Sequence, residues 1–312
     1  MADSFCDDMK MATRPARQEI NGWLAIDKPL GMTSAQVVAK VKHLLHPMKI
    51  GHAGTLDPLA TGVLPLAFGK ATKTIPYVMD GSKKYRFEVT FGQKTQTDDA
   101  EGKITDECSF IPSEQQIKDV LPSLTGKILQ TPSVFSALKV NGRRAYELAR
   151  EGKKVTLNPR EIEIFSLTLT EQTDEKKFVF EAECSKGTYI RSLACQIAEL
   201  TGSLGFVSML RRIKCHSFFE KDAILLEKLE EMVHNGIALD LISPIETALT
   251  DILELALTRE LSKKLSFGQP LKAPEAMAEG TILKAVFEGK TIALVAVKNG
   301  YFVPFRVFGL TS

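Results

Sequence analysis

The residues of this chain with the clearest capacity for chemistry lie between positions 51 and 62, which read Gly-His-Ala-Gly-Thr-Leu-Asp-Pro-Leu-Ala-Thr-Gly. Asp57 is the one carboxylate in this stretch, and its neighbours are small, apolar or hydroxylic. Gly54, Gly62 and Pro58 specify the backbone around it, because glycine reaches conformations closed to other residues and proline fixes φ. The pattern predicts a positioned nucleophile, with a structural Asx-turn as the alternative. His52, in the same stretch, is a candidate for positioning a substrate.

A carboxylate in an apolar loop needs a cationic partner. The segment Lys186-Gly187-Thr188-Tyr189-Ile190-Arg191 offers one, since an arginine can hold a carboxylate through two parallel hydrogen bonds. Arg191 would keep Asp57 ionised and aimed, and Tyr189 would place a phenol near the same site. The alternative is a strand-to-helix turn that carries a surface arginine.

Other chemistries fit less well. A phosphoaspartyl enzyme usually places a second acid two residues after its nucleophile and needs Mg²⁺, but the residue at that position is Leu59. His43 and His46 have the i, i+3 spacing of helical metal ligands but lack a nearby third ligand. Tyr85 is either an ordinary sheet aromatic or a platform for a base extruded from its stack, a contact of roughly 1–3 kcal/mol.

The elements that must position these residues can be read from local patterns. Thr33 and Gln36 form a capping box at the start of a helix that ends at Pro47, and Ser113 with Gln116 caps a second, short helix. Alternation of apolar and polar residues predicts strands, and Asn299-Gly300 between two such runs predicts a hairpin. The other expected elements are a helix over 189–200, strands over 85–91 and 178–184, and hairpin strands over 291–297 and 301–308; the short helix runs up to Leu121.

Composition sets wider bounds. The 312 residues are 44% hydrophobic, enough for one large core and a small second domain, and the net charge of +2 says little about partners. Five cysteines without a Cys-x-x-Cys pair favour a reduced, cytoplasmic setting, and no apolar run approaches the roughly 20 residues of a membrane span. Residues 1–20 lack the pattern of a secretory signal and are expected to be a flexible extension. Residues 127–160 hold eight Lys or Arg against two Glu and are expected to form a mobile, phosphate-contacting excursion.

Taken together, these segments resemble the bacterial tRNA pseudouridine synthase B (TruB) family. The resemblance covers residues 21–215 and is weaker beyond residue 250. It rests on Asp27-Lys28-Pro29-Leu30-Gly31-Met32-Thr33-Ser34, on the Asp57 loop, on Lys84-Tyr85-Arg86-Phe87, on the Arg191 segment, on Met209-Leu210-Arg211-Arg212, and on residues 130–146.

The resemblance implies an α+β fold with a mixed, mostly antiparallel central sheet flanked by helices. It also implies a catalytic domain over 21–245, with an RNA-gripping insertion at 127–160, and a small β-rich PUA-like RNA-binding domain over 250–312. The implied activity converts uridine 55 in the T-loop of tRNA to pseudouridine without a metal or other cofactor. The expected partner is the T-arm of tRNA, without a guide RNA, and the expected state is a monomer.

The resemblance also implies roles for single residues. Asp57 would attack C1′ of the ribose or C6 of the base; Arg191 would orient it, Tyr85 would stack on the base, and Tyr189 would hydrogen-bond near the reacting centre. The expected substrate-binding residues are His52, Lys28, Pro29, Leu210, Arg143 and Arg144, of which Lys28 and Pro29 would shape the cleft wall beneath the Asp57 loop. A non-catalytic RNA-binding protein that kept the scaffold is the competing hypothesis.

Overall fold

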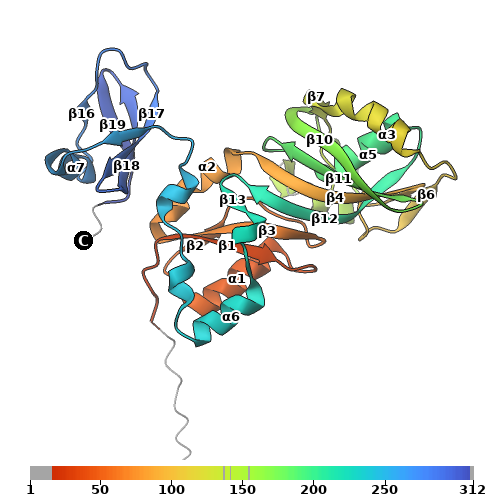
Figure 1. Cartoon of the computed structure of the whole chain (residues 1–312), viewed down its shortest axis with the longest axis horizontal. Helices are drawn as coiled ribbons and strands as arrows, with labels where there is room; N and C mark the ends of the chain where they lie inside the picture. The colour runs from red at the N-terminus through yellow and green to blue at the C-terminus, as the bar shows by residue number, and fades with distance from the viewer. Residues whose placement is uncertain (1–15, 136–137, 141, 154, 310–312) are drawn as a thin grey trace, which may run out of the picture.

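Two separate β-sheets organise the chain in a computed structural model that describes residues 16–309, except 136–137, 141 and 154. The larger sheet lies at the centre of the molecule, and the smaller sheet forms a separate lobe at the C-terminal end (Figure 1). This arrangement confirms the predicted mixed sheet with a C-terminal β-rich region.

The central sheet has ten strands, of which eight follow the order β14-β1-β3-β12-β4-β11-β10-β7, while β2 pairs with β3 and β13 with β12. Most pairs are antiparallel; β1 with β14 and β3 with β12 are parallel. The strands are β1 Gly22–Lys28, β2 Ile50–His52, β3 Ala60–Phe68, β4 Lys83–Phe91, β7 Gly126–Gln130, β10 Arg160–Asp174, β11 Lys177–Cys184, β12 Gly205–Cys215, β13 Phe218–Phe219 and β14 Ile224–Leu225.

Helices flank the sheet on both of its halves (Figure 1). Their bounds are α1 Ser34–Leu45, α2 Ile75–Asp80, α3 Glu114–Val120, α4 Ala145–Arg150, α5 Ile190–Leu200 and α6 Leu226–His234. The capping boxes expected at Thr33 and Ser113 are both present. Val37, Val41 and Leu45 lie on one face of helix α1, because residues four positions apart share a helix face, and all three are buried. None of the described helices has both the length and the apolar character needed to cross a bilayer.

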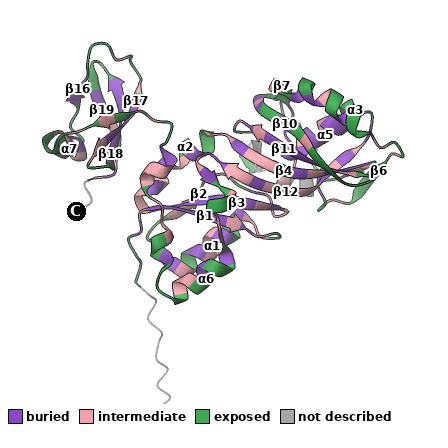
Figure 2. Ribbon diagram, viewed as in Figure 1, coloured by how far each residue is buried: buried purple, intermediate pink, exposed green. Residues whose placement is uncertain are grey.

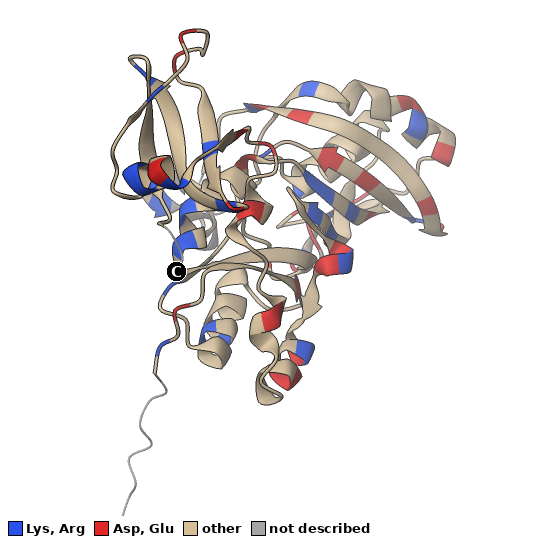
Figure 3. Cartoon of the chain, turned by 60° about the vertical axis from the view of Figure 1, so that its left-hand side comes forward, with Lys and Arg blue, Asp and Glu red and all other residues tan. Residues whose placement is uncertain are grey.

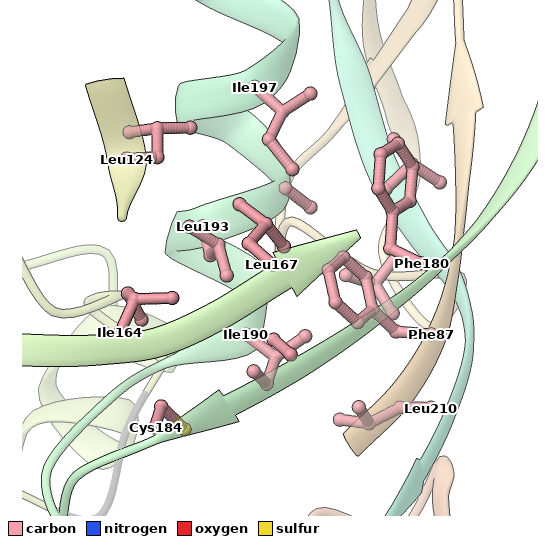
Figure 4. Close-up of a cluster of buried hydrophobic side chains, with 14 of the residues drawn as sticks. Phe87, Leu124, Ile164, Leu167, Phe180, Cys184, Ile190, Leu193, Ile197 and Leu210 are labelled. Carbon is pink, nitrogen blue, oxygen red and sulfur yellow. The ribbon is translucent and has the colours of Figure 1, made fainter. Parts of the chain in front are cut away.

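The largest core cluster lies between α5 and the sheet and fixes where the first turn of α5 points. Ile190, Leu193 and Ile197 of α5 are buried in the same cluster as Phe87 and Phe180, whose rings stack with centroids 5.4 Å apart (Figure 4). Burial in Figure 2 follows this arrangement, with purple segments through the sheet and green segments on the outer faces of α3 and α6. Because α5 is held so firmly, a side chain in its first turn has a defined position.

The C-terminal sheet has the order β15-β17-β18-β19-β16 and packs against one helix. The predicted hairpin is confirmed: Asn299 and Gly300 have φ of 50° and 76° and join two antiparallel strands. A cluster of Leu249, Leu294 and Phe308 with Tyr77 attaches this lobe to the central one. The elements are β15 Glu254–Ala256, α7 Arg259–Ser266, β16 Leu271–Lys272, β17 Ile282–Phe287, β18 Lys290–Lys298 and β19 Tyr301–Val307.

Two expected boundaries differ from the structure. Residues 126–130 are strand β7 of the central sheet, where Lys127 lies opposite Glu163 of β10, so the insertion begins after Gln130 and not at Lys127. At the other end of the chain, Gln18 already bonds with the backbone of His46 and Met48, and Ile20 is buried in a core cluster. The packed chain therefore begins at Gln18 instead of residue 21, and residues 1–15 of the expected extension lie outside the described residues.

Candidate active site

The Asp57 loop connects two paired strands, β2 and β3, so its two ends are fixed in the central sheet. Gly62, at the start of β3, has φ of 97°, and a Cβ there would lie 2.3 Å from the carbonyl oxygen of Arg212. Only glycine fits that position. The side chain of Asp57 is 39% exposed, so its carboxylate can meet a substrate while the loop around it stays packed.

Arg191, in the first turn of α5, forms the ion pair with Asp57 that the sequence suggests. Its Nη2 lies 3.0 Å from Oδ2 of Asp57, and its own side chain is only 6% exposed. The guanidinium also donates to the carbonyl oxygens of Thr97 at 3.0 Å and Phe135 at 2.8 Å. With partners on several sides, the guanidinium has a fixed direction, which in turn restricts the carboxylate.

A second carboxylate, which sequence reasoning missed, completes the surroundings of Arg191. Nη1 of Arg191 lies 3.5 Å from Oδ2 of Asp99, whose side chain is 4% exposed. The other oxygen of Asp99 accepts hydrogen bonds from the Thr97 hydroxyl and the Glu101 amide. Asp99 occurs in an acidic turn of ordinary composition, so no local signal distinguishes it from a surface residue. The arginine is thus held between a buried carboxylate and a half-exposed one.

Arg212 supports the loop from β12 and is also buried. Its Nε donates to the carbonyl oxygen of Val63 at 2.8 Å, and its Nη2 donates to that of Gly54 at 3.0 Å. Tyr85 is its cross-strand neighbour and packs against the main core cluster. Tyr85 is half-buried at this position. Burial raises the pKa of Tyr85 to about 12, although Arg212 acts in the opposite direction.

Lys28 lies beneath the loop with no exposed surface, so it cannot contact RNA as a substrate-binding residue would. Its Nζ donates to the carbonyl oxygens of Pro29 at 2.9 Å and Pro58 at 3.2 Å. Burial lowers the pKa of Lys28 to about 8, an effect that the charge of Asp57 partly opposes. These contacts tie the segment after β1 to the residue that follows Asp57.

Three other expected site residues, His52, Leu210 and Tyr189, differ in where they lie relative to the cavity. His52 lines the cavity in front of Asp57; burial and then Arg212 lower its pKa, which favours the uncharged ring. Leu210 is 7% exposed and belongs to the core cluster drawn in Figure 4, a cluster that also includes Leu56 of the loop. Tyr189 is the residue just before α5, is half-buried, and its amide donates to Oε1 of Gln130 at 2.7 Å.

A cavity of about 920 Å³ opens in front of Asp57 and Arg191. This is within the usual size range of ligand pockets, roughly 300–1,000 Å³. Its walls come from three regions: the Asp57 loop with the start of α1, the turn between β5 (Gln93–Thr95) and β6 (Ile104–Glu107), and the insertion, which contributes Phe135, Tyr146 and Gly152. Tyr85, Tyr189, Leu210 and Lys28 are not among the residues that line it.

The insertion carries its charges in pairs. Arg143 lies on β9 (Arg143–Arg144), which pairs with β8 (Lys139–Val140) ahead of α4. Its guanidinium and the Lys153 ammonium both contact Glu151, the latter at 2.8 Å. These hydrogen bonds, the one from Arg143 first, lower the pKa of Glu151 to about 2. Acidic and basic segments are interspersed over the rest of the ribbon as well (Figure 3).

In the described part of the chain, no group of three or more His, Cys, Asp or Glu side chains is arranged so that it could bind a metal ion. His43 and His46 approach each other edge to face with ring centroids 5.9 Å apart. The pair thus packs together without a third ligand among the described residues.

Comparison with known proteins gives consistent matches. The family model for the N-terminal domain of TruB family pseudouridylate synthases matches residues 42–190. The tRNA pseudouridine synthase B of Bradyrhizobium diazoefficiens is 46% identical over 307 residues, covering 96% of this chain and 89% of the relative. That of Rhodospirillum rubrum is 42% identical over 308 residues, covering 96% of this chain and all of the relative.

The solved structures that are similar show the same fold at low identity. An H/ACA ribonucleoprotein bound to a substrate RNA containing 2′-deoxyuridine includes a chain with a TM-score of 0.71 and 22% identity. The match covers 93% of this chain and 85% of that chain. At this identity the likeness establishes the architecture of the central sheet and the C-terminal lobe, and no more.

Proposed function

This chain belongs to the TruB family of pseudouridylate synthases, isomerases that act on tRNA, and we propose that it converts uridine 55 in the T-loop of tRNA to pseudouridine. The reaction breaks the N1–C1′ bond of one nucleotide and forms a C5–C1′ bond. The proton on C5 leaves and N1 gains one, so nothing is added or lost overall. A nucleophile, a cavity for an extruded base and a proton acceptor are therefore sufficient.

One observation carries the proposal: a half-exposed carboxylate, paired with a buried guanidinium, faces a cavity. Asp57 contacts Arg191 at 3.0 Å through one oxygen, and part of its surface remains open to the cavity. A carboxylate held in this way is restrained in direction, as attack on C1′ or C6 requires. A protein that only binds RNA needs no such pair.

The surrounding residues have roles that fit the proposal. From the family resemblance we infer that Tyr85 stacks on the base and that Tyr189 hydrogen-bonds near the reacting centre, although neither lines the cavity, and that His52, which does line it, helps to hold the extruded nucleotide. Leu210 and Lys28 act from beneath the loop, since both are buried. Arg143 and Arg144 on β9 would contact phosphates, as would the C-terminal lobe as a PUA-like RNA-binding domain.

We infer further that the enzyme works as a monomer on the T-arm, in the cytoplasm and without a guide RNA. Residues 131–159 would serve as the RNA-gripping insertion, because Phe135, Tyr146 and Gly152 line the same cavity as Asp57.

The experiment uses a tRNA transcript that carries tritium on C5 of its uridines. The protein alone should release tritium from this transcript, without added metal or cofactor, and a transcript with cytidine at position 55 should release none. Mass-spectrometric mapping should place the single pseudouridine at position 55. Tritium release from the cytidine-55 transcript would overturn the assignment of the position, and no release from either transcript would overturn the activity.

A further inference from the structure

The hydroxyl of Ser34 makes two hydrogen bonds to one residue that is distant in sequence. Ser34 Oγ accepts from the Leu56 amide at 2.9 Å and donates to the Leu56 carbonyl oxygen at 3.2 Å. Ser34 is 1% exposed, and Leu56 is 4% exposed in the main core cluster. One side chain thereby satisfies both backbone groups of a buried residue, which would otherwise be left unpaired. Leu56 is the residue immediately before Asp57.

The neighbouring residue, Thr33, caps the helix, so the Ser34 hydroxyl can bond to Leu56 instead. At most helix starts a serine or threonine side chain is used to cap the first amides of the helix. Here Thr33 makes that cap: its hydroxyl accepts from the Gln36 amide at 3.1 Å, and the Gln36 side chain accepts from the Thr33 amide at 2.8 Å. The capping box fixes the first turn of α1, and with it the position of the Ser34 hydroxyl.

The residue on the other side of Asp57 is held by the same part of the chain. The carbonyl oxygen of Pro58 accepts from the Gly31 amide at 2.9 Å and from Lys28 Nζ at 3.2 Å. Residues 56 and 58 are thus both bonded to residues 28–34, which run from the last residue of β1 to the first residue of α1. Asp57 lies between these two anchors in the chain, and its side chain pairs with Arg191 of α5.

We propose that Ser34 is a positioning residue for the reaction: it fixes the main chain at Leu56 so that the Asp57 carboxylate faces Arg191 and the cavity. Ser34 is at the edge of the cavity, but its hydroxyl is bonded to both backbone groups of Leu56, so it acts through Leu56. This inference rests on the proposed function. A small displacement of a nucleophile lowers the rate of a reaction far more than it lowers binding of a large substrate.

The test compares Ser34→Ala with Ser203→Ala. Ser203 is a matched control because it is also buried, lies in the same lobe and donates to the carbonyl oxygen of Phe110 at 2.7 Å, away from the cavity in front of Asp57. For Ser34→Ala the single-turnover rate of tritium release should fall about 10- to 100-fold, with the Kd for tRNA within about twofold of the wild type. Ser203→Ala should keep the wild-type rate, even if its Tm falls as much as that of Ser34→Ala.

A second measurement separates positioning from general stability and does not depend on how a variant folds. In the wild-type protein without RNA, the amide of Leu56 should exchange with solvent slowly and that of the exposed Thr55 quickly. Fast exchange at Leu56 would overturn the proposal, as would a Ser34→Ala protein with the wild-type rate. Absence of tritium release from the wild-type protein would instead refute the proposed function.

Discussion

The Asp57 loop and the insertion after Gln130 both line one cavity, yet they are held in different ways. The loop is tied by buried groups from three elements: Ser34 from α1, Arg212 from β12 and Arg191 from α5. Each of these side chains is at most 6% exposed. Hydrogen bonds in such surroundings are not exchanged for water and hold their geometry.

The insertion is held mainly at its base. Thr131 accepts a hydrogen bond from the Ser192 hydroxyl, Ser133 donates to Asp98, and Phe135 accepts from Arg191. Farther along, the ion pairs of Glu151 join insertion residues to one another, and all of them are exposed. Exposed ion pairs contribute little to stability and are easily replaced by others.

The difference suggests a division of work within the cavity. A rigid wall suits a nucleophile, whose distance to carbon must be set before the substrate arrives. A wall with exchangeable surface pairs suits a phosphate backbone, because its cations can leave Glu151 for a phosphate. Changes in the loop should therefore alter rate, and changes in the insertion should alter affinity.

The largest effect is expected for Asp57→Asn, because the amide keeps the shape of the carboxylate but is a poor nucleophile. Tritium release should fall by at least about three orders of magnitude, with the Kd for tRNA unchanged within about twofold. Asp106→Asn on β6, an exposed carboxylate outside the cavity, is the control and should keep the full rate. Full activity of Asp57→Asn would end the nucleophile assignment.

The next effect concerns Asp99, which shares Arg191 with Asp57. Asp99→Asn removes the buried carboxylate that pairs with the Arg191 guanidinium. The single-turnover rate should therefore fall about 10- to 100-fold, while the Kd for tRNA stays within about threefold. The neighbouring Asp98→Asn is the control, since Asp98 accepts from Ser133 and is not paired with Arg191. An equal loss of rate in both variants would argue against a specific role for Asp99.

A pH dependence should follow from Lys28. Its pKa is about 8 in the folded state and about 10.5 when exposed, so between these values the unfolded chain binds more protons. Stability must then rise with pH across this window, by about 1–2 kcal/mol from pH 7.5 to 9.5. Denaturant titrations of the wild type and of Lys28→Met measure it: the free-energy difference between the two proteins should shift in favour of the wild type as pH increases. A constant difference would show that burial does not perturb this ammonium.

Local signals in the sequence were sufficient for much of this architecture. The capping boxes at Thr33 and Ser113 and the Asn299-Gly300 turn depend on residues within four positions of each other, and all three are present. The glycine and proline pattern around Asp57 is equally local.

What the sequence did not reveal depends on contacts between distant segments. Asp99 meets Arg191 across 92 positions and Ser34 meets Leu56 across 22, and neither residue type is unusual where it stands. Strand β7 was assigned to the insertion because Lys127 extends the basic run, whereas its pairing with β10 decides its place.

The smallest effect is expected in the insertion, where Arg143→Gln should weaken tRNA binding about two- to tenfold without lowering the single-turnover rate at saturating enzyme. If Arg143 leaves Glu151 to contact a phosphate, it releases one counterion from the tRNA on binding, and the Arg143→Gln variant would release one fewer. The slope of log K against log salt concentration should then become shallower by about 0.7–0.9. Lys40→Gln on α1, where Lys40 pairs with Glu230 away from the cavity, should change neither quantity. A loss of rate in Arg143→Gln, with affinity and slope unchanged, would mean that the insertion also positions the reacting groups, and the division between the two walls would fail.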